Sequence, residues 1–371
     1  MKLGAFLVPS RPPERSRSDN RCWELEELVR LEELGLDEAW IGEQIATSWG
    51  TCDLPELIIA RSLFETNRIR LGTLGYLLPH NNPIEMANRI AYLDHVSNGR
   101  IQLGIGVRSL PADNIIAEAE VGRSSRLSFE LIETMVDLWQ TEAPKIEYGR
   151  GSMEATGISL PWLGRDCKPL QQPHPPIAIA AITPSSRNLR FAGEKGYIPI
   201  SLSVDPDGSC TALHWRTVQK GAERSGLSPD PEAWRIVRDI YVAPTDAEAR
   251  DCAVNGIMGR CWREFILPAY LEMGLGATLK RDRSMPDDAI DIDYLVENVW
   301  LVGSPETVTE RLFDLYIRSG GFGYLLAASY NAQDEEQTWE RSLRLLSQEV
   351  LPACNRLIKK SKNCLASEDV R

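Results

Sequence analysis

The segment 68–106 limits the possible folds more than any other part of the chain. Apolar and polar residues alternate at 69–73, which predicts a short strand. Pro83 stands where a helix would begin, and apolar residues follow at helical spacing until Asn98-Gly99, a pair that predicts the helix end. A second strand pattern opens at Arg100. Two strands joined by one helix over so short a distance run parallel, so the segment predicts a βαβ unit.

The same alternation of strand and helix patterns fills the chain. An alternating β/α series of this length predicts either a (β/α)8 barrel or an open doubly wound sheet. Eight regular units without a change in composition favour the barrel, so the predicted class is an α/β protein with a (β/α)8 TIM barrel. The expected strands are 2–8, 35–42 (with its turn), 69–73, 100–106, 176–181, 197–203, 234–242 and 321–328.

Two insertions interrupt the regular pattern. Segment 145–175, rich in glycine and proline, predicts a β-hairpin-like insertion before strand 5. Segment 274–298 predicts a second insertion before strand 8, for which a disordered linker is the alternative. Long loops at the mouth of a barrel often act as lids. We expect 1–360 to form a single barrel domain and 361–371 to form a polar C-terminal tail.

Composition narrows the class of partner. The 371 residues carry a net charge of −12, which argues against a nucleic acid or an acidic membrane surface as partner. No apolar run approaches the length of about 18 residues that a transmembrane helix needs. The eight cysteines include no Cys-x-x-Cys pair, so neither a zinc site nor a disulfide scaffold is expected. The sequence predicts a cytoplasmic protein without a metal site.

The residues that follow the predicted strands decide what the barrel mouth binds. Arg108 follows strand 4, and Ser185 and Ser186 follow strand 5. A guanidinium beside hydroxyls and backbone N–H groups at a helix start suits a phosphate, although a serine also caps helices for structural reasons. The apolar stretch 74–78, which contains a glycine, would suit a flat aromatic ring or serve as ordinary strand-end packing. On their own, these residues leave both interpretations open, a binding site or ordinary helix capping and strand-end packing.

Several sequence strings occur in order along nearly the whole chain. They are GLDEAWIGE at 35–43, LGT at 71–73 with prolines at 79 and 83, LDHVSNGR at 93–100 and LVGSPE at 301–306. Together they resemble the bacterial luciferase-like flavin-dependent monooxygenases. Within that family the chain is most similar to the limonene monooxygenase-like branch, through LQQPHPP at 170–176 and SLPAD at 109–113.

This resemblance implies FMN at the C-terminal mouth of the barrel and often a homodimer. The family generally uses reduced FMN from a separate flavin reductase, with O2, and a C4a-peroxyflavin then oxygenates the substrate, here a small or medium apolar metabolite. A cis peptide beneath the flavin ring maps to Leu74-Gly75, and the family's phosphate-binding arginine maps to Val107, with Arg108 adjacent. The implied cofactor-binding residues are Leu74, Gly75, Tyr76, Gly106, Val107, Arg108, Ser185 and Ser186.

The chain departs from the family pattern at two histidines. Gln44 stands where the second strand commonly ends in histidine, and Asn82 stands where histidine commonly precedes proline. An amide donates and accepts hydrogen bonds but transfers no proton near neutral pH. We therefore predict that Gln44 holds an oxygen atom by hydrogen bonding and that His80 is the catalytic proton donor. The alternative for His80 is a surface loop histidine.

Two other functions stay open at this point. The chain could be an oxidoreductase of the same superfamily that uses the deazaflavin F420 and performs no oxygen chemistry. It could also be a flavin-binding protein without turnover, as the two missing histidines suggest. The sequence does not identify the substrate. Four aromatic residues could line an apolar mouth or pack in the core, namely Trp49, Trp262, Phe265 and Trp300.

Overall fold

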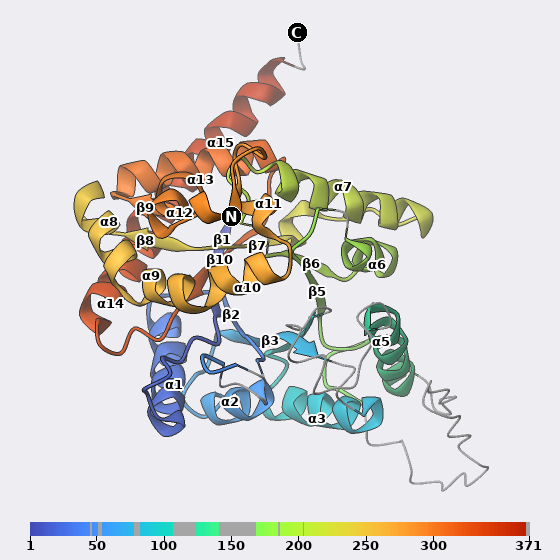
Figure 1. Ribbon diagram of the computed structural model, residues 1–371. Coiled ribbons are helices and arrows are strands. Elements are labelled where there is room, and N and C mark those ends of the chain that lie inside the picture. The colour runs from blue at the N-terminus through green and yellow to red at the C-terminus, as the bar shows by residue number, and fades with distance from the viewer. Residues whose placement is uncertain are drawn as a thin grey trace, which may run out of the picture.

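A closed parallel barrel lies at the centre of the computed structural model (Figure 1), which describes residues 1–44, 47–50, 54–77, 82–106, 124–140, 168–184, 186–202 and 204–368. Within these ranges the strand order around the barrel is β1-β10-β7-β6-β5-β4-β3-β2, so the predicted (β/α)8 TIM barrel is confirmed. The barrel strands are β1 (Lys2–Leu7), β2 (Glu38–Ile41), β3 (Arg70–Leu77), β4 (Ile101–Gly106), β5 (Ile177–Ala181), β6 (Ile198–Ser201), β7 (Arg235–Arg238) and β10 (Tyr324–Ser329).

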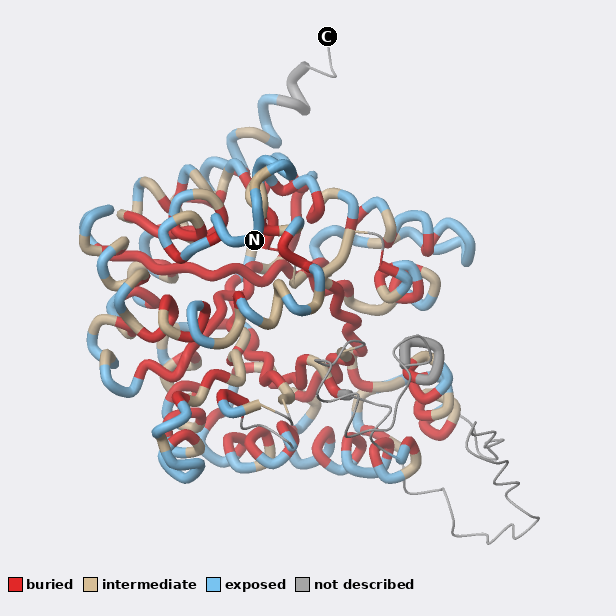
Figure 2. Tube along the Cα trace, in the orientation of Figure 1, coloured by how far each residue is buried: buried red, intermediate tan, exposed pale blue. Residues whose placement is uncertain are grey.

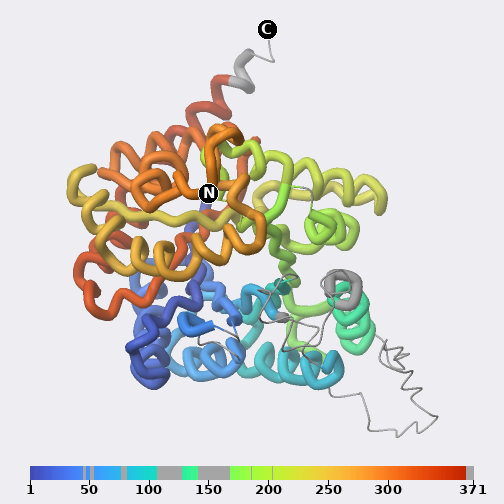
Figure 3. The backbone as a smooth tube through the Cα atoms, in the orientation of Figure 1, coloured from blue at the N-terminus to red at the C-terminus, as the bar shows by residue number. Residues whose placement is uncertain are grey.

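Helices surround the barrel, with buried residues inward and exposed residues outward (Figure 2). Consecutive units lie side by side, from blue and cyan at the bottom of Figure 3 to yellow and red at the top. No helix of the described ranges is long and apolar enough to cross a membrane. The main helices are α1 (Arg17–Glu33), α2 (Pro55–Ser62), α3 (Pro83–Val96), α5 (Ser124–Gln140), α6 (Arg187–Lys195), α7 (Ser209–Arg224), α8 (Asp246–Asn255), α9 (Ile257–Cys261), α10 (Leu267–Glu272), α13 (Pro305–Ser319), α14 (Glu336–Leu345) and α15 (Leu351–Glu368).

The seventh predicted strand is wrong in its extent. The segment 234–242 forms two strands, β7 and β8 (Ile240–Val242), and the chain leaves the barrel between them at Asp239. Strand β8 pairs in parallel with β9 (Leu301–Gly303), a strand that the sequence did not predict. The Leu301 amide donates to the Asp239 carbonyl oxygen at 2.9 Å and so anchors the break.

The insertion before the last barrel strand is helical, not a linker. It contains α11 (Gly276–Leu279) and α12 (Ile292–Asn298). It follows α8, α9 and α10, and a π-helical turn, η3 (Trp262–Ile266), lies between α9 and α10. The predicted hairpin at 145–175 lies outside the described residues as far as 167. The expected tail from 361 is helical to Glu368, at the end of α15, which projects from the body (Figure 1).

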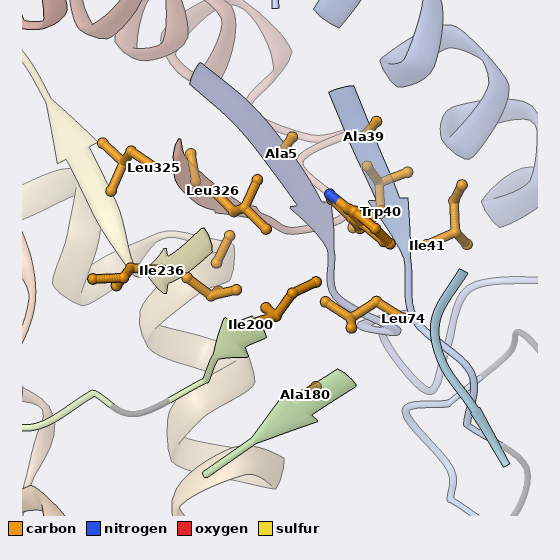
Figure 4. Packing of buried hydrophobic residues seen from close by; sticks show 14 of the residues in the cluster. Ala5, Ala39, Trp40, Ile41, Leu74, Ala180, Ile200, Ile236, Leu325 and Leu326 are labelled. Atoms are coloured by element: carbon orange, nitrogen blue, oxygen red, sulfur yellow. The ribbon is translucent and has the colours of Figure 1, made fainter. Parts of the chain in front are cut away.

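An indole ring fills the barrel interior on the β2–β3 side. Trp40 is fully buried, and its Nε1 donates to Oε1 of Glu38 at 2.8 Å. Gly72 makes room for it, because a Cβ at Gly72 would lie 2.5 Å from Cε3 of Trp40. In Figure 4 the side chains of Leu74 and Ile200 extend into the same interior. The interior is therefore packed with side chains and is not a pore.

A buried ion pair closes the end of the barrel at which the strands begin. Glu38 opens β2 and Arg235 opens β7, and Nη2 of the arginine lies 3.0 Å from Oε2 of the glutamate. Gln102 donates to the same carboxylate at 3.3 Å, and the guanidinium stacks over the Tyr324 ring, 3.9 Å from its centroid. This polar floor leaves the opposite, C-terminal end of the strands for binding.

Candidate active site

The mouth of the barrel holds a cavity of about 210 Å³. Its walls come from the C-terminal ends of the strands, from the segments that follow them and from η3 and α10, and most of its lining side chains are apolar. Such a cavity suits an apolar ligand or a flat aromatic ring. The lining residues are Phe6, Val8, Pro9, Gly42, Glu43, Gln44, Leu74, Ile182, Leu202, Val204, Val237, Asp239, Trp262, Phe265, Ile266, Tyr270, Ala328 and Tyr330.

Two of the four aromatic candidates border this cavity. Trp262 and Phe265 lie on η3 and line it directly. Trp49 stacks on Phe265 with ring centroids 6.5 Å apart, and Trp300 packs against Trp262 at 5.6 Å. Neither Trp49 nor Trp300 is among the lining residues. They support the aromatic wall from behind.

The predicted residues at the ends of β2 and β3 meet at the cavity. Gln44 and Leu74 both line it. The Leu74-Gly75 peptide bond is cis, as the family resemblance predicted. Gly75 packs directly on Gly106 of the neighbouring strand, because a Cβ at Gly75 would lie 2.1 Å from the Gly106 amide nitrogen. The roles of these residues toward a flavin stay predictions.

Tyr76 lies apart from the cavity lining. Its side chain is buried, and burial raises the pKa of its phenol, with the negative charge of Glu56 on α2 as a further cause. Because the phenol of Tyr76 lies near Glu56 of α2, a helix outside the barrel, Tyr76 is on the outer side of β3. A contact between Tyr76 and a cofactor stays a prediction.

A second, smaller cavity of about 60 Å³ adjoins the first, since Ile182 and Leu202 border both. Its lining includes Gly106 and the side chains of Thr183, Ser186 and Asn188. Ser186 is the N-cap of α6, and its hydroxyl oxygen accepts a hydrogen bond from the backbone N–H of Asn188 at 3.2 Å. The structure thus brings Gly106 and Ser186 together at a helix N-terminus, where N–H groups and the helix dipole favour an anion.

A buried histidine holds the loop beside this small cavity. His214 Nε2 lies 2.8 Å from the Thr183 carbonyl oxygen and therefore donates to it. Its Nδ1 must then accept from the Ser201 hydroxyl at 3.0 Å, and that oxygen accepts from Trp234 Nε1 at 2.9 Å. Burial lowers the pKa of His214 to about 4. A neutral imidazole thus ties the loop after β5 to β6 and α7.

Four of the predicted site residues lie outside the described residues. They are His80 in the loop after β3, Val107 and Arg108 after β4, and Ser185 after β5. Of the three side chains predicted to bind the phosphate, Arg108, Ser185 and Ser186, the structure describes Ser186. The role of His80 as proton donor stays a prediction.

Residues 1–321 match the model of the luciferase-like monooxygenases. This chain belongs to that family. The monooxygenase is 30% identical to 2,5-diketocamphane 1,2-monooxygenase 1 of Pseudomonas putida, over 95% of this chain and 99% of the relative. It is 26% identical to limonene 1,2-monooxygenase of Rhodococcus erythropolis, over 95% of this chain and 86% of the relative.

A solved structure is similar to this chain over nearly its whole length. It is the oxygenating constituent of 3,6-diketocamphane monooxygenase from Pseudomonas putida, described as a type II Baeyer–Villiger monooxygenase and solved in complex with FMN. It superposes with a TM-score of 0.82 and 27% identity, covering 95% of this chain and 98% of that one. The predicted family, barrel and enzyme class, a monooxygenase, are confirmed.

The monooxygenase also carries a buried carboxyl group in its cavity that the sequence analysis missed. Asp239, at the break after β7, is 3% exposed. Its Oδ1 accepts a hydrogen bond from Trp262 Nε1 at 3.0 Å and another from the Tyr330 hydroxyl. Burial raises the pKa of Asp239, and these donated bonds oppose that rise. The charged pair Arg238-Asp239 between the apolar residues 236–237 and 240–242 was the available signal, because charged residues are seldom placed in a buried strand.

Proposed function

We propose that this monooxygenase binds FMN across the two adjoining cavities and oxygenates a compact apolar ketone. The observation that carries the proposal is the junction of a large apolar cavity with a smaller one that has Thr183, Ser186 and Asn188 in its wall at a helix N-terminus. A flavin has the same division between an apolar ring and a charged phosphate. The family and the similar FMN complex support this assignment.

The residues present fit the cofactor at both ends. Ser186, Asn188 and the first N–H groups of α6 are donors that suit a phosphate. Leu74 and the aromatic wall offer apolar surface to the ring. When bound in its reduced form, FMN activates O2 and supplies the oxygen atom that enters the substrate. The protein in the similar structure is the oxygenating constituent of its monooxygenase, which supports delivery of reduced FMN by a separate flavin reductase.

The chain's own residues control the environment of that chemistry. Gln44 holds an oxygen atom at the cavity by hydrogen bonding, because an amide has no proton to transfer near neutral pH. Phe265 and Ile266 on η3 narrow the cavity with apolar surface and exclude water. We retain His80 as the proposed proton donor.

The substrate class follows from the relatives and from the apolar lining of the cavity. Two of the relatives are named for diketocamphanes, which are compact bicyclic ketones, and one is described as a Baeyer–Villiger enzyme. The apolar side chains of the cavity suit the carbon skeleton of such a ketone beside the flavin ring. We therefore propose insertion of one oxygen atom beside the carbonyl carbon of such a ketone.

Anaerobic titration of the purified protein with FMN, reduced FMN and F420 tests the cofactor. We expect reduced FMN to bind, and ¹⁸O2 to label the product in a reaction with a flavin reductase. Binding of F420 in place of FMN, without oxygen incorporation, would contradict the proposal. Gln44→Ala should release hydrogen peroxide instead of product with FMN affinity unchanged, whereas Gln44→His should retain turnover.

The outer face of α2 and α3 supports a homodimer. Phe64 after α2 is 80% exposed and Tyr92 on α3 is 71% exposed, with Leu57 on α2 at 61%. The two helices lie together, because Arg89 of α3 pairs with Glu56 of α2 at 3.3 Å. An exposed apolar face of this kind marks an interface, and a two-fold axis would bring it onto its copy.

Light scattering after gel filtration tests the dimer. Phe64→Glu combined with Tyr92→Glu should give the monomer mass, because the substitutions would place charges in the interface. Leu227→Glu is the matched control, since Leu227 is an exposed apolar residue at 44% after α7. A parent protein that is already monomeric at micromolar concentration would refute this interface.

A cytoplasmic location is part of the same proposal. The six cysteines among the described residues form no disulfide with one another. Free thiols are usual where glutathione and thioredoxin keep proteins reduced. Fractionation of the producing cells would test the location.

A further inference from the structure

The hydrogen bonds of Asp239 determine where a proton on its carboxyl group would reside. Trp262 Nε1 is a donor only, and it donates both to Oδ1 of Asp239 and, at 2.9 Å, to the Tyr330 oxygen. The Tyr330 hydroxyl then directs its own hydrogen to Oδ1. With two donors on Oδ1, that oxygen acts as an acceptor, so a proton on the carboxyl group belongs on Oδ2.

Oδ2 is the atom available to a ligand. Asp239 lines the main cavity, and no hydrogen bond links its Oδ2 to another residue of the described ranges. Trp262 and Tyr330 border the same cavity, so the group that holds Oδ1 also fixes the direction of Oδ2. An oriented polar atom in an otherwise apolar cavity is a typical determinant of ligand orientation.

Burial favours the neutral acid of Asp239, and it outweighs the opposing charge of the neighbouring Arg238 and the bonds donated to Oδ1. No lysine or arginine of the described chain forms an ion pair with Asp239, since Arg238 directs its guanidinium to Thr211 at 3.0 Å and to Asp205 at 3.5 Å. Cys261 and Tyr270, which also face it, are neutral groups whose pKa values burial raises.

We infer that Asp239 is a substrate-binding residue whose protonated carboxyl group donates a hydrogen bond from Oδ2 to the carbonyl oxygen of the ketone. The inference rests on the proposed function. A carbonyl oxygen accepts hydrogen bonds but has none to donate, so it complements the acid and not a carboxylate. Negative charge that develops on this oxygen during nucleophilic attack strengthens the bond, which is the usual contribution of an oriented donor to carbonyl chemistry.

The inference predicts discrimination between two ligands that share a carbon skeleton. Norcamphor is a bicyclic ketone, and norbornane is the same skeleton without the carbonyl group. Headspace gas chromatography over the flavin-free protein measures the binding of both volatile probes and requires no turnover. We expect the parent protein to bind norcamphor in preference to norbornane at neutral pH.

Two substitutions separate hydrogen bonding from packing. Asp239→Leu removes the donor and keeps the bulk, so it should weaken norcamphor binding roughly tenfold and leave norbornane nearly unchanged. Asp239→Asn keeps an N–H donor toward the cavity, so norcamphor affinity should stay within about threefold. In the parent the affinity should fall as alkaline pH ionises Asp239, whereas in Asp239→Asn it should not change with pH.

Several results would overturn the inference. Norcamphor binding that is unchanged in Asp239→Leu would exclude the hydrogen bond. Norcamphor binding about tenfold tighter in Asp239→Asn than in the parent would show that the native group is ionised and repels the ketone. If Asp239→Leu does not fold, the Asp239→Asn comparison and its pH dependence decide the question alone. Failure of the proposed function would appear separately, as absence of FMN binding in the parent.

Discussion

Acidification should destabilise this protein through one buried imidazole, that of His214. The native structure keeps it neutral, because its Nδ1 accepts from Ser201 and burial lowers its pKa to about 4 from an ordinary value of 6.5. The unfolded chain takes up a proton near pH 6.5, whereas the native protein takes it up only near pH 4. The stability that His214 contributes is therefore complete above pH 6.5 and declines as the pH falls toward 4.

The size of the effect follows from the two pKa values. Between about pH 7.5 and about pH 5, proton uptake by the unfolded chain alone lowers the free energy of unfolding by about 2 kcal/mol. The full difference, reached below both values, is about 3 kcal/mol. Either amount is a large part of the stability of an ordinary domain.

Urea unfolding of the flavin-free protein at several pH values provides the assay. The comparison is with His214→Gln, whose amide donor can still reach Thr183 but does not titrate, so other titrating groups cancel in the difference. His95→Gln is the matched control, because His95 is exposed and bonds the Lys168 carbonyl oxygen at 2.9 Å. The reasoning is refuted if the parent loses no more stability than His214→Gln between about pH 7.5 and about pH 5.

Three further outcomes are expected. Gly72→Ala should lower the free energy of unfolding by about 1–3 kcal/mol, because the new Cβ meets the Trp40 ring; an unchanged melting temperature would contradict this. Ser186→Ala should cost about 1 kcal/mol of stability and weaken FMN binding roughly tenfold in a fluorescence titration, and full affinity would remove Ser186 from the phosphate site. Arg235→Met should cost about 3–5 kcal/mol in urea unfolding by leaving the charge of Glu38 buried and unpaired, and adding Glu38→Gln, which removes the charge but keeps an acceptor for Trp40, should recover much of it.

The barrel was predictable because its local patterns agree with its topology. Pro83, the predicted helix start, is the first residue of α3, and Asn98-Gly99, the predicted helix end, directly follows the C-cap residue Ser97. The break in the seventh strand was not predictable from pattern, since 234–242 reads as one continuous buried run. Only the tertiary contacts of Asp239 and the amide of Leu301 end the strand there.

The candidate site was predictable where it follows strand ends and not where it depends on distant elements. Gln44 follows β2, Leu74 lies in β3 and Ser186 follows β5. The fold alone therefore brings these residues to the mouth of the barrel. Asp239 becomes a candidate only when η3 places Trp262 against it and β10 brings Tyr330 to the same oxygen. Neither of these contacts leaves a pattern in the local sequence.

Substitutions in the π-helical turn η3 should change which substrates fit the cavity without lowering the stability of the barrel. Its wide turn places Phe265 and Ile266 on the cavity wall together with Trp262, and none of the three takes part in a barrel strand pair. Trp262 is fixed by its bond to Asp239, whereas the other two side chains are only half-buried. Directed evolution toward larger or differently shaped ketones should therefore accumulate its tolerated substitutions at Phe265 and Ile266, with little loss of melting temperature.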